Sequence, residues 1–180
     1  MTQIYLVRHG EPDYAAVDSR RLPGLAADTA PLTPTGAKQA EAVADLLSGI
    51  GATYLVSSPF TRALHSAAII GHRLALGVRV DYDLRDWLPE SSGYWRGQSD
   101  VRAAQAELDG YDGEWPEGIH RPWEPLSAVR ERALAALERH TANTDGPVLA
   151  LTHSMVIRAL TGERNTAHGA HEYYRYESNA

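Results

Sequence analysis

Apolar residues follow two patterns along this chain: short continuous runs, and stripes at helical spacing. Continuous β-prone runs bounded by turn residues are typical of buried strands. Such runs occur at Ile4–Val7, Thr53–Val56, Val78–Val80 and Val148–Leu151. We predict a strand at each of them, and a last edge strand in the aromatic C-terminal segment HEYYRYESN.

Segments whose apolar residues recur at helical spacing lie between most of these runs. Thr33-Pro34 is a favourable helix start, because a hydroxyl at the N-cap is followed by proline at the first helical position. The residues after it place alanine, valine, leucine and isoleucine on one apolar stripe. Further helices are predicted at residues 60–76, 125–140 and 155–160, with a short one at Val101–Leu108.

Two segments show no periodic spacing of apolar residues. The stretch Gly10–Leu32 is rich in proline and is predicted to form a long loop. Residues 87–123 combine glycine, proline and aspartate with all four tryptophans of the chain. We predict that this second segment forms a loop-rich lid.

Strands that alternate with helices favour an α/β domain with a mostly parallel central sheet. The chain has 180 residues, which suits a single domain, 1–180, with the lid around 87–123. In open α/β sheets, ligands bind beyond the carboxyl ends of the strands. The residues that follow the predicted strands are therefore the first candidates for a functional site.

Cations and imidazoles follow three of the predicted strands. Arg8 and His9 follow the first strand, Arg62 lies in the first turn of the helix after the second, and His153 follows the fourth. If these strand ends share one edge of the sheet, the four side chains converge with peptide N–H groups of helix N-termini. Arginine offers paired donors to phosphate oxygens, and helix N-termini favour negative charge. The pattern predicts a site for a tetrahedral oxyanion.

Histidine adds chemistry to this anion site. A neutral imidazole nitrogen is a nucleophile at physiological pH and can accept a phosphoryl group. The cations and a protonated second histidine would offset charge on the equatorial oxygens. An acid is also needed to protonate the leaving oxygen. This interpretation requires that the rings of His9 and His153 face one pocket that is open to solvent.

Composition and charge limit the classes of binding partner that we expect. The net charge is -6 and the sequence pI is about 5.7, so we expect neither nucleic-acid binding nor membrane binding. The chain contains no cysteine, which excludes disulfides and thiolate nucleophiles. The N-terminus shows no signal-peptide pattern, and no apolar run reaches the length of a membrane span. We predict a cytoplasmic protein; its oligomeric state is not specified by the sequence.

Four motifs carry a resemblance to a known family. LVRHGE on the first strand, then PLTPTGAKQAE, SSPFTRALHSA and a late LTHS resemble the histidine phosphatase superfamily, also called the phosphoglycerate mutase-like family. The resemblance runs from Ile4 to about Leu160. It implies a three-layer α/β/α sandwich and hydrolysis of small phosphate monoesters through a phosphohistidine, with neither a metal nor an organic cofactor.

The resemblance also implies roles for individual residues. His9 corresponds to the nucleophile, while Arg8, Arg62 and His153 correspond to residues that hold the phosphoryl group. We add Ser154, directly after His153, to the phosphate-binding set. Gly10 and Glu11 complete the first motif, and Glu11 is expected to orient neighbouring groups.

The general acid is the point at which the sequence departs from the family pattern. Members usually carry a glutamate in an L-x-E segment, followed closely by a G-x-W/L-E-G segment. Here the chain reads DLRDWLPESSGYWRGQ, so distance from the third strand selects Asp86, whereas distance from Gly93–Gly97 selects Glu90. We favour Asp86 because strand ends fix positions better than loops do, and Glu90 stays the alternative.

Other interpretations follow from the same residues. A phosphoglycerate-type mutase would return the phosphoryl group to substrate, but the resemblance implies that such mutases are longer than this chain. A phosphate-binding pseudophosphatase would have lost turnover with the altered acid segment. His168 and His171, three residues apart near the C-terminus, suggest a metal site only weakly, and we interpret them as part of a surface tail.

Overall fold

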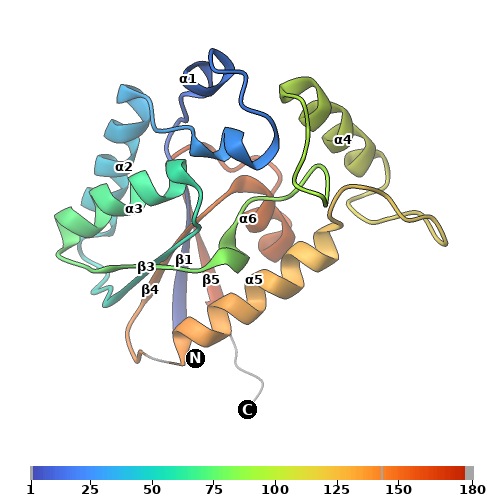
Figure 1. Ribbon diagram of the computed structural model, residues 1–180. Coiled ribbons are helices and arrows are strands. Elements are labelled where there is room, and N and C mark those ends of the chain that lie inside the picture. Colours follow the sequence, from blue (N-terminus) through green and yellow to red (C-terminus); the bar gives the residue numbers. More distant parts are fainter. Residues whose placement is uncertain (1, 143, 177–180) are drawn as a thin grey trace.

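A central sheet with helices on both faces forms the body of the protein (Figure 1). The computed structural model describes residues 2–142 and 144–176. The strands are β1 (Thr2–Arg8), β2 (Tyr54–Ser57), β3 (Val78–Val80), β4 (Val148–Thr152) and β5 (His171–Tyr176). The helices are α1 (Tyr14–Asp18), α2 (Pro34–Leu47), α3 (Thr61–Leu74), α4 (Gln98–Gly110), α5 (Leu126–Thr141) and α6 (Ser154–Thr161), with 3-10 turns η1 (Gly24–Thr29) and η2 (Tyr82–Leu84).

The sheet has five strands in the order β3-β2-β4-β1-β5. β1, β2, β3 and β4 run parallel, and β5 pairs antiparallel with β1 at one edge. β1 and β4 are in register up to their carboxyl ends, where Arg8 lies opposite Thr152. The predicted α/β fold with a mostly parallel sheet is confirmed.

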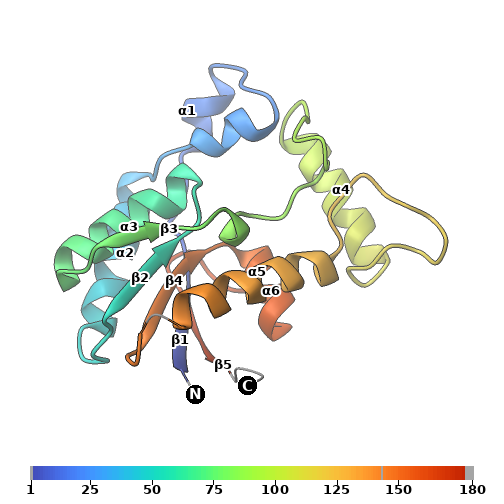
Figure 2. The ribbon, with the colours of Figure 1, turned by 60° about the horizontal axis from the view of Figure 1, so that its bottom comes forward.

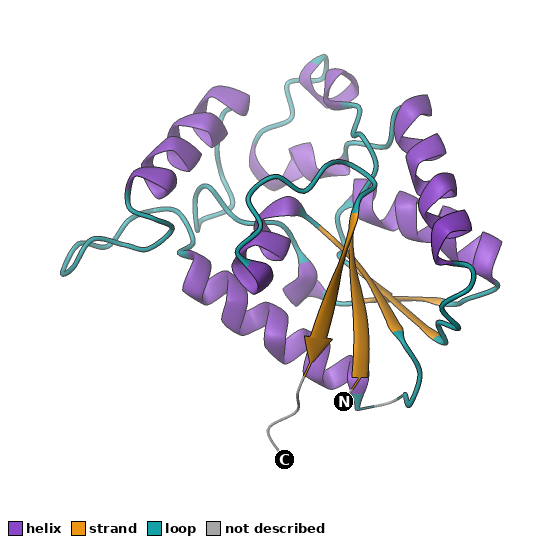
Figure 3. Ribbon diagram, turned by 180° about the vertical axis from the view of Figure 1, so that it is seen from behind, coloured by secondary structure: helices purple, strands orange, loops and turns teal. Residues whose placement is uncertain are grey.

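Side-chain alternation along the strands creates a core on each face of the sheet. On one face, Val7, Leu55 and Leu151 pack under α2 and α3. On the opposite face, Ile4 and Val56 pack under α5 and α6. Figure 3 shows these helical layers on either side of the strands. Because both faces are covered at β1, β2 and β4, these parallel strands contain continuous apolar runs, which is the pattern that identifies them in the sequence. The edge strand β3 is exposed.

A side-chain N-cap defines the start of α2. The Thr33 hydroxyl accepts a hydrogen bond from Gly36 N at 3.0 Å, which confirms the predicted N-cap of α2. The predicted lid contains more helix than the sequence pattern indicates, because α4 spans 13 residues. Its partly buried Val101 and buried Leu108 pack against the core under α5 and α6, and this tertiary contact stabilises the helix.

Two loop segments meet above the carboxyl ends of the strands (Figure 2). Gly24 N, at the start of η1, donates to Trp95 O at 2.8 Å, and Leu25 N donates to Gly93 O at 3.1 Å. These backbone hydrogen bonds join the long loop after β1 to the segment before α4. In the part of the chain that the structure describes, no helix has both the length and the apolar character required to cross a membrane.

Candidate active site

The parallel register of β1 and β4 brings the two strand-end histidines together. His9 follows Arg8 and His153 follows Thr152, and these preceding residues are partners across the ladder. The ring centroids of His9 and His153 are 5.0 Å apart. Arg62 arrives from the first turn of α3, which follows the neighbouring strand β2. Residues separated by up to about 150 positions therefore meet because their strands end at one edge of the sheet.

The His9 ring is held in one tautomer. Its Nδ1 lies 2.7 Å from Gly10 O, and a carbonyl oxygen only accepts, so Nδ1 carries the proton. Nε2 therefore has a free lone pair, and it accepts a hydrogen bond from Arg62 Nε at 3.3 Å. Burial lowers the pKa of His9 well below its ordinary value, and the nearby His153 and Arg62 lower it further. The ring is a neutral imidazole at neutral pH.

His153 occupies the centre of the site and is fully buried. Its Nε2 forms a 2.7 Å hydrogen bond with the Ser58 hydroxyl, and its Nδ1 lies 3.4 Å from Asp86 Oδ2. Burial, followed by the charge of Arg62, lowers the pKa of His153 well below its ordinary value. Protonation of this ring at neutral pH therefore requires an additional anion beside it.

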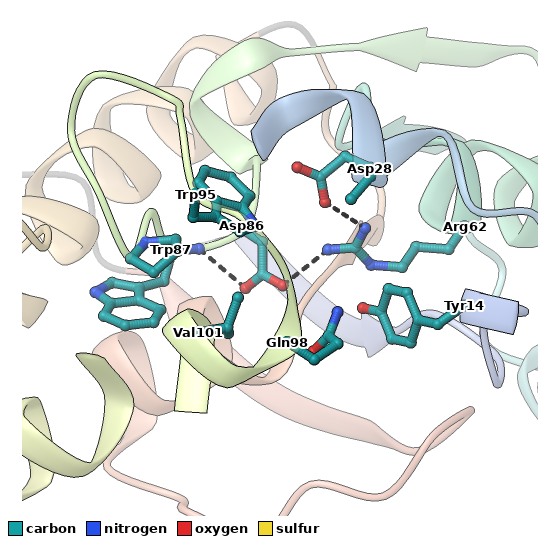
Figure 4. A pocket seen from close by; sticks show the side chains of 10 residues that line it. Tyr14, Asp28, Arg62, Asp86, Trp87, Trp95, Gln98 and Val101 are labelled. Atoms are coloured by element: carbon teal, nitrogen blue, oxygen red, sulfur yellow. Dashed lines mark hydrogen bonds and ion pairs between the residues drawn. The ribbon is translucent and has the colours of Figure 1, made fainter. Parts of the chain in front are cut away.

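Arg62, which bonds His9, also pairs with two carboxylates, and Figure 4 shows these two pairs. Its Nη1 donates to Asp28 Oδ1 at 2.7 Å, and its Nη2 donates to Asp86 Oδ2 at 2.9 Å. Although burial acts in the opposite direction, the electrostatic interactions with Tyr14, Asp86 and Asp28 raise the pKa of Arg62. The guanidinium is thus a fixed cation, and each of its two terminal nitrogens is already paired with a carboxylate.

Asp28 is a site residue that sequence reasoning did not identify. It comes from η1, in the aperiodic loop after β1, and its side chain is 14% exposed. Burial raises the pKa of its carboxyl to about 6, although the charge of Arg62 acts in the opposite direction. Nothing in the sequence pattern separates Asp28 from other loop carboxylates, because only the folding of η1 over the strand ends brings it to Arg62.

The C-terminal segment contributes a third histidine, which corrects our interpretation of His168 as part of a surface tail. Arg8 Nη2 donates to His168 Nε2 at 2.9 Å, and the ring centroid of His168 is 5.5 Å from that of His9. The antiparallel pairing of β5 with β1 causes this placement: Gly169 N donates to His9 O at 3.1 Å. His168 therefore lies half-buried at the site and positions Arg8.

Gly10 and Glu11 determine how α2 approaches β1. A Cβ at Gly10 would lie 2.2 Å from Gly36 O, so only glycine permits this contact between the two chain segments. Glu11 accepts a hydrogen bond from the Thr33 hydroxyl at 2.8 Å, and its backbone N–H donates to Gln39. Both residues therefore fix the start of α2 beside the site.

The cavity beside Arg62 has a volume of about 60 Å³. Its lining residues are Tyr14, Ala27, Asp28, Arg62, Asp86, Trp87, Pro89, Trp95, Gln98 and Val101. Neither histidine of the pair is among them: His9 is 3% exposed and His153 is 0% exposed. The expectation that both rings are open to solvent is wrong, because the Arg62 side chain bonds His9 Nε2 and lies between this ring and the cavity.

The match with a known family covers nearly the whole chain. The family model described as histidine phosphatase superfamily (branch 1) matches residues 4–176. The chain belongs to the histidine phosphatase superfamily. Because this match includes all four motif regions, the resemblance noted from the sequence is confirmed.

Several named proteins are similar to this histidine phosphatase. One is the protein named probable phosphoglycerate mutase GpmB of Escherichia coli, 33% identical over 175 residues, covering 89% of this chain and 73% of that one. Another is the native structure of a mycobacterial glucosyl-3-phosphoglycerate phosphatase, with 27% identity, a TM-score of 0.68 and coverage of 90% and 78%. The structure of Bacillus stearothermophilus YhfR, at 24% identity and a TM-score of 0.68, shares the fold, covering 90% and 79%. The family match and the 27% identical phosphatase are consistent with a hydrolase that acts on phosphoric monoesters.

The structure separates the two candidates for the acid in this histidine phosphatase. Asp86 lines the cavity and bonds Arg62, and its Oδ1 accepts a hydrogen bond from Trp87 N at 2.9 Å. Glu90 is outside the lining, and its Oε1 accepts from Ser92 N at 3.1 Å in an exposed turn. Ser154 begins α6 beside His153 and is partly buried.

Proposed function

We propose that this protein hydrolyses small phosphate monoesters through a covalent phosphoryl intermediate on His9 Nε2. The observation that carries the proposal is the neutral Nε2 lone pair of His9, held by the Nδ1 bond to Gly10 O and located 3.3 Å from a permanent cation, Arg62. A nucleophile beside a fixed guanidinium suits attack on an anionic phosphoryl group.

The first half-reaction transfers the phosphoryl group to the enzyme. The Nε2 lone pair of His9 forms a bond to phosphorus as the phosphorus–oxygen bond to the leaving group breaks. A protonated Asp86 carboxyl gives its proton to the leaving oxygen. Arg8, Arg62 and His153 offset the charge on the equatorial oxygens, and the dianion raises the pKa of His153 so that the ring becomes a donor.

The second half-reaction regenerates the enzyme. Water attacks the phosphorus of phospho-His9, the Nε2–phosphorus bond breaks, and the Asp86 carboxylate takes a proton from the water. Inorganic phosphate then leaves, and both residues return to their starting protonation states. For either step, Arg62 must exchange carboxylate partners for phosphoryl oxygens, since its two terminal nitrogens are bonded to Asp28 and Asp86. The Arg62 side chain must also move off His9 Nε2, because this buried nitrogen does not line the cavity and the phosphorus has to reach it.

The identity of the acid is tested by comparing leaving groups. We expect Asp86→Asn to lower kcat with an alkyl phosphate by about 10²- to 10⁴-fold, because a poor leaving group requires protonation. The loss with p-nitrophenyl phosphate should be much smaller, since that leaving group departs as an anion. Glu90→Gln serves as the matched control and should behave as wild type with both esters. Equal losses with the two esters in Asp86→Asn would remove Asp86 from the acid role.

A mutase is the second candidate, favoured by the 33% identity to a protein named probable phosphoglycerate mutase. The two activities are separated by supplying 3-phosphoglycerate and p-nitrophenyl phosphate in parallel and following inorganic phosphate and 2-phosphoglycerate. We expect phosphate release to exceed isomerisation by a wide margin. Faster isomerisation would establish the mutase, and one phosphoryl unit per enzyme without turnover would establish the pseudophosphatase.

A cytoplasmic location and independence from metals stay predictions from the sequence.

A further inference from the structure

The cavity beside Arg62 is poor in cations. Among the described residues that line it, Arg62 is the one basic side chain, and it is shared between the carboxylates of Asp28 and Asp86. The remaining lining includes the rings of Tyr14, Trp87 and Trp95 and the amide of Gln98. Figure 4 shows these groups around the Arg62 guanidinium. Carboxylates together with aromatic faces are the environment that proteins offer to ammonium groups.

We propose that the substrate is a phosphomonoester whose leaving group carries a positive charge, as in a short amino-alcohol phosphate, and that Asp28 selects this charge. The inference rests on the proposed phosphatase function and adds the class of substrate to it.

The balance of charge around Arg62 supports this assignment. A phosphoryl dianion that binds Arg62 replaces the carboxylates on its terminal nitrogens. Asp86 loses its charge when it serves as the protonated acid. Burial raises the pKa of the Asp28 carboxyl to about 6, so once Arg62 binds phosphate this mostly buried carboxyl keeps its charge only beside another cation. An unpaired buried carboxylate is strongly unfavourable. An ammonium group on the substrate restores a partner to Asp28, whereas a second anion adds repulsion.

The size of the cavity limits the class of substrate further. A volume of about 60 Å³ suits a leaving group of a few non-hydrogen atoms. Trp87 and Trp95 are mostly buried and line the cavity, so the leaving group would lie beside these residues and the two carboxylates. A carboxylate-bearing ester such as a phosphoglycerate would place its anion among Asp28, Asp86 and the aromatic faces, where no described lining cation is left to receive it.

The test compares three esters of similar length: O-phosphoethanolamine, propyl phosphate and phosphoglycolate, which are cationic, neutral and anionic at the distal end. We expect kcat/KM for O-phosphoethanolamine to exceed that for phosphoglycolate by about tenfold or more. Asp28→Asn should reduce the ratio of kcat/KM for O-phosphoethanolamine to that for propyl phosphate by about tenfold. Comparing this ratio between enzymes cancels the intrinsic reactivity of each ester.

A matched control is available on the surface. Asp45 also pairs with an arginine, Arg73, but the pair is exposed and remote from the cavity, so Asp45→Asn should leave the ratio unchanged. Hydrolysis of p-nitrophenyl phosphate without a preference for O-phosphoethanolamine over phosphoglycolate would overturn the inference and leave the phosphatase intact. An unchanged ratio in a folded Asp28→Asn variant would also overturn it. Failure to hydrolyse any ester, p-nitrophenyl phosphate included, would overturn the proposed function and this inference with it. If Asp28→Asn does not fold, the comparison of the three esters with the wild-type enzyme still tests the inference.

Discussion

Replacing His9 with alanine is expected to reduce turnover of p-nitrophenyl phosphate by at least about 10⁴-fold, because the variant lacks the proposed nucleophile. The covalent intermediate should disappear as well. Intact-mass measurement after rapid quenching in base, where phosphohistidine survives, should show one added phosphoryl group on the wild type and none on His9→Ala. The fold should persist, since removing a neutral ring leaves no unpaired charge.

The control for His9→Ala is His72→Ala. His72 is an exposed residue on α3, away from the strand ends, so its replacement should leave both turnover and the phosphoryl adduct unchanged. A phosphoryl adduct on His9→Ala would show that another imidazole at the site accepts the group. The two neighbouring rings, His153 and His168, would then become the candidates.

Arg62→Lys is expected to lower kcat by about 10²- to 10³-fold while a positive charge is retained. Lysine cannot supply paired donors to the phosphoryl oxygens, and it loses the Nε bond that contacts His9 Nε2. We choose lysine over alanine because alanine would leave Asp28 and Asp86 without their shared cation. Steady-state kinetics with p-nitrophenyl phosphate, together with thermal unfolding, separates loss of catalysis from loss of stability.

Arg73→Lys is the matched control for this variant. Arg73 lies on the same helix and pairs with a carboxylate, Asp45, but it is exposed at the other end of α3. Its replacement should change neither kcat nor the unfolding temperature appreciably, since exposed ion pairs contribute little. If Arg62→Lys behaved like Arg73→Lys, charge alone would account for the role of Arg62 and its geometry would be irrelevant.

The clustering of Arg8, His9, Arg62 and His153 follows from the sequence for a simple reason. Each follows a short buried run, directly or at the start of the next helix, and parallel strands end at one edge of the sheet. Buried parallel strands are recognisable because both of their faces are apolar. The same logic explains why Asp86, anchored to η2 after β3, lies in the site, whereas Glu90 in the following turn does not.

The segments without periodic apolar spacing allowed few predictions about the site. Asp28 and His168 reach the site through contacts between distant loops and strands, namely η1 against the segment before α4, and β5 against β1. Such contacts depend on packing rather than on spacing along the chain, so no local pattern indicates them. The closure of Arg62 over His9 is of the same kind, since it depends on two carboxylates from separate loops.

The amino-acid order alone determined the class of fold and the four cationic or imidazole groups at its centre, since strand length, helix period and strand ends are local properties. Tertiary structure decided which carboxylates join them, which tautomer His9 adopts, and that the Arg62 guanidinium group covers His9. Those features arise from distances between segments far apart in the chain, and the electrostatics of a buried site depend on such distances above all.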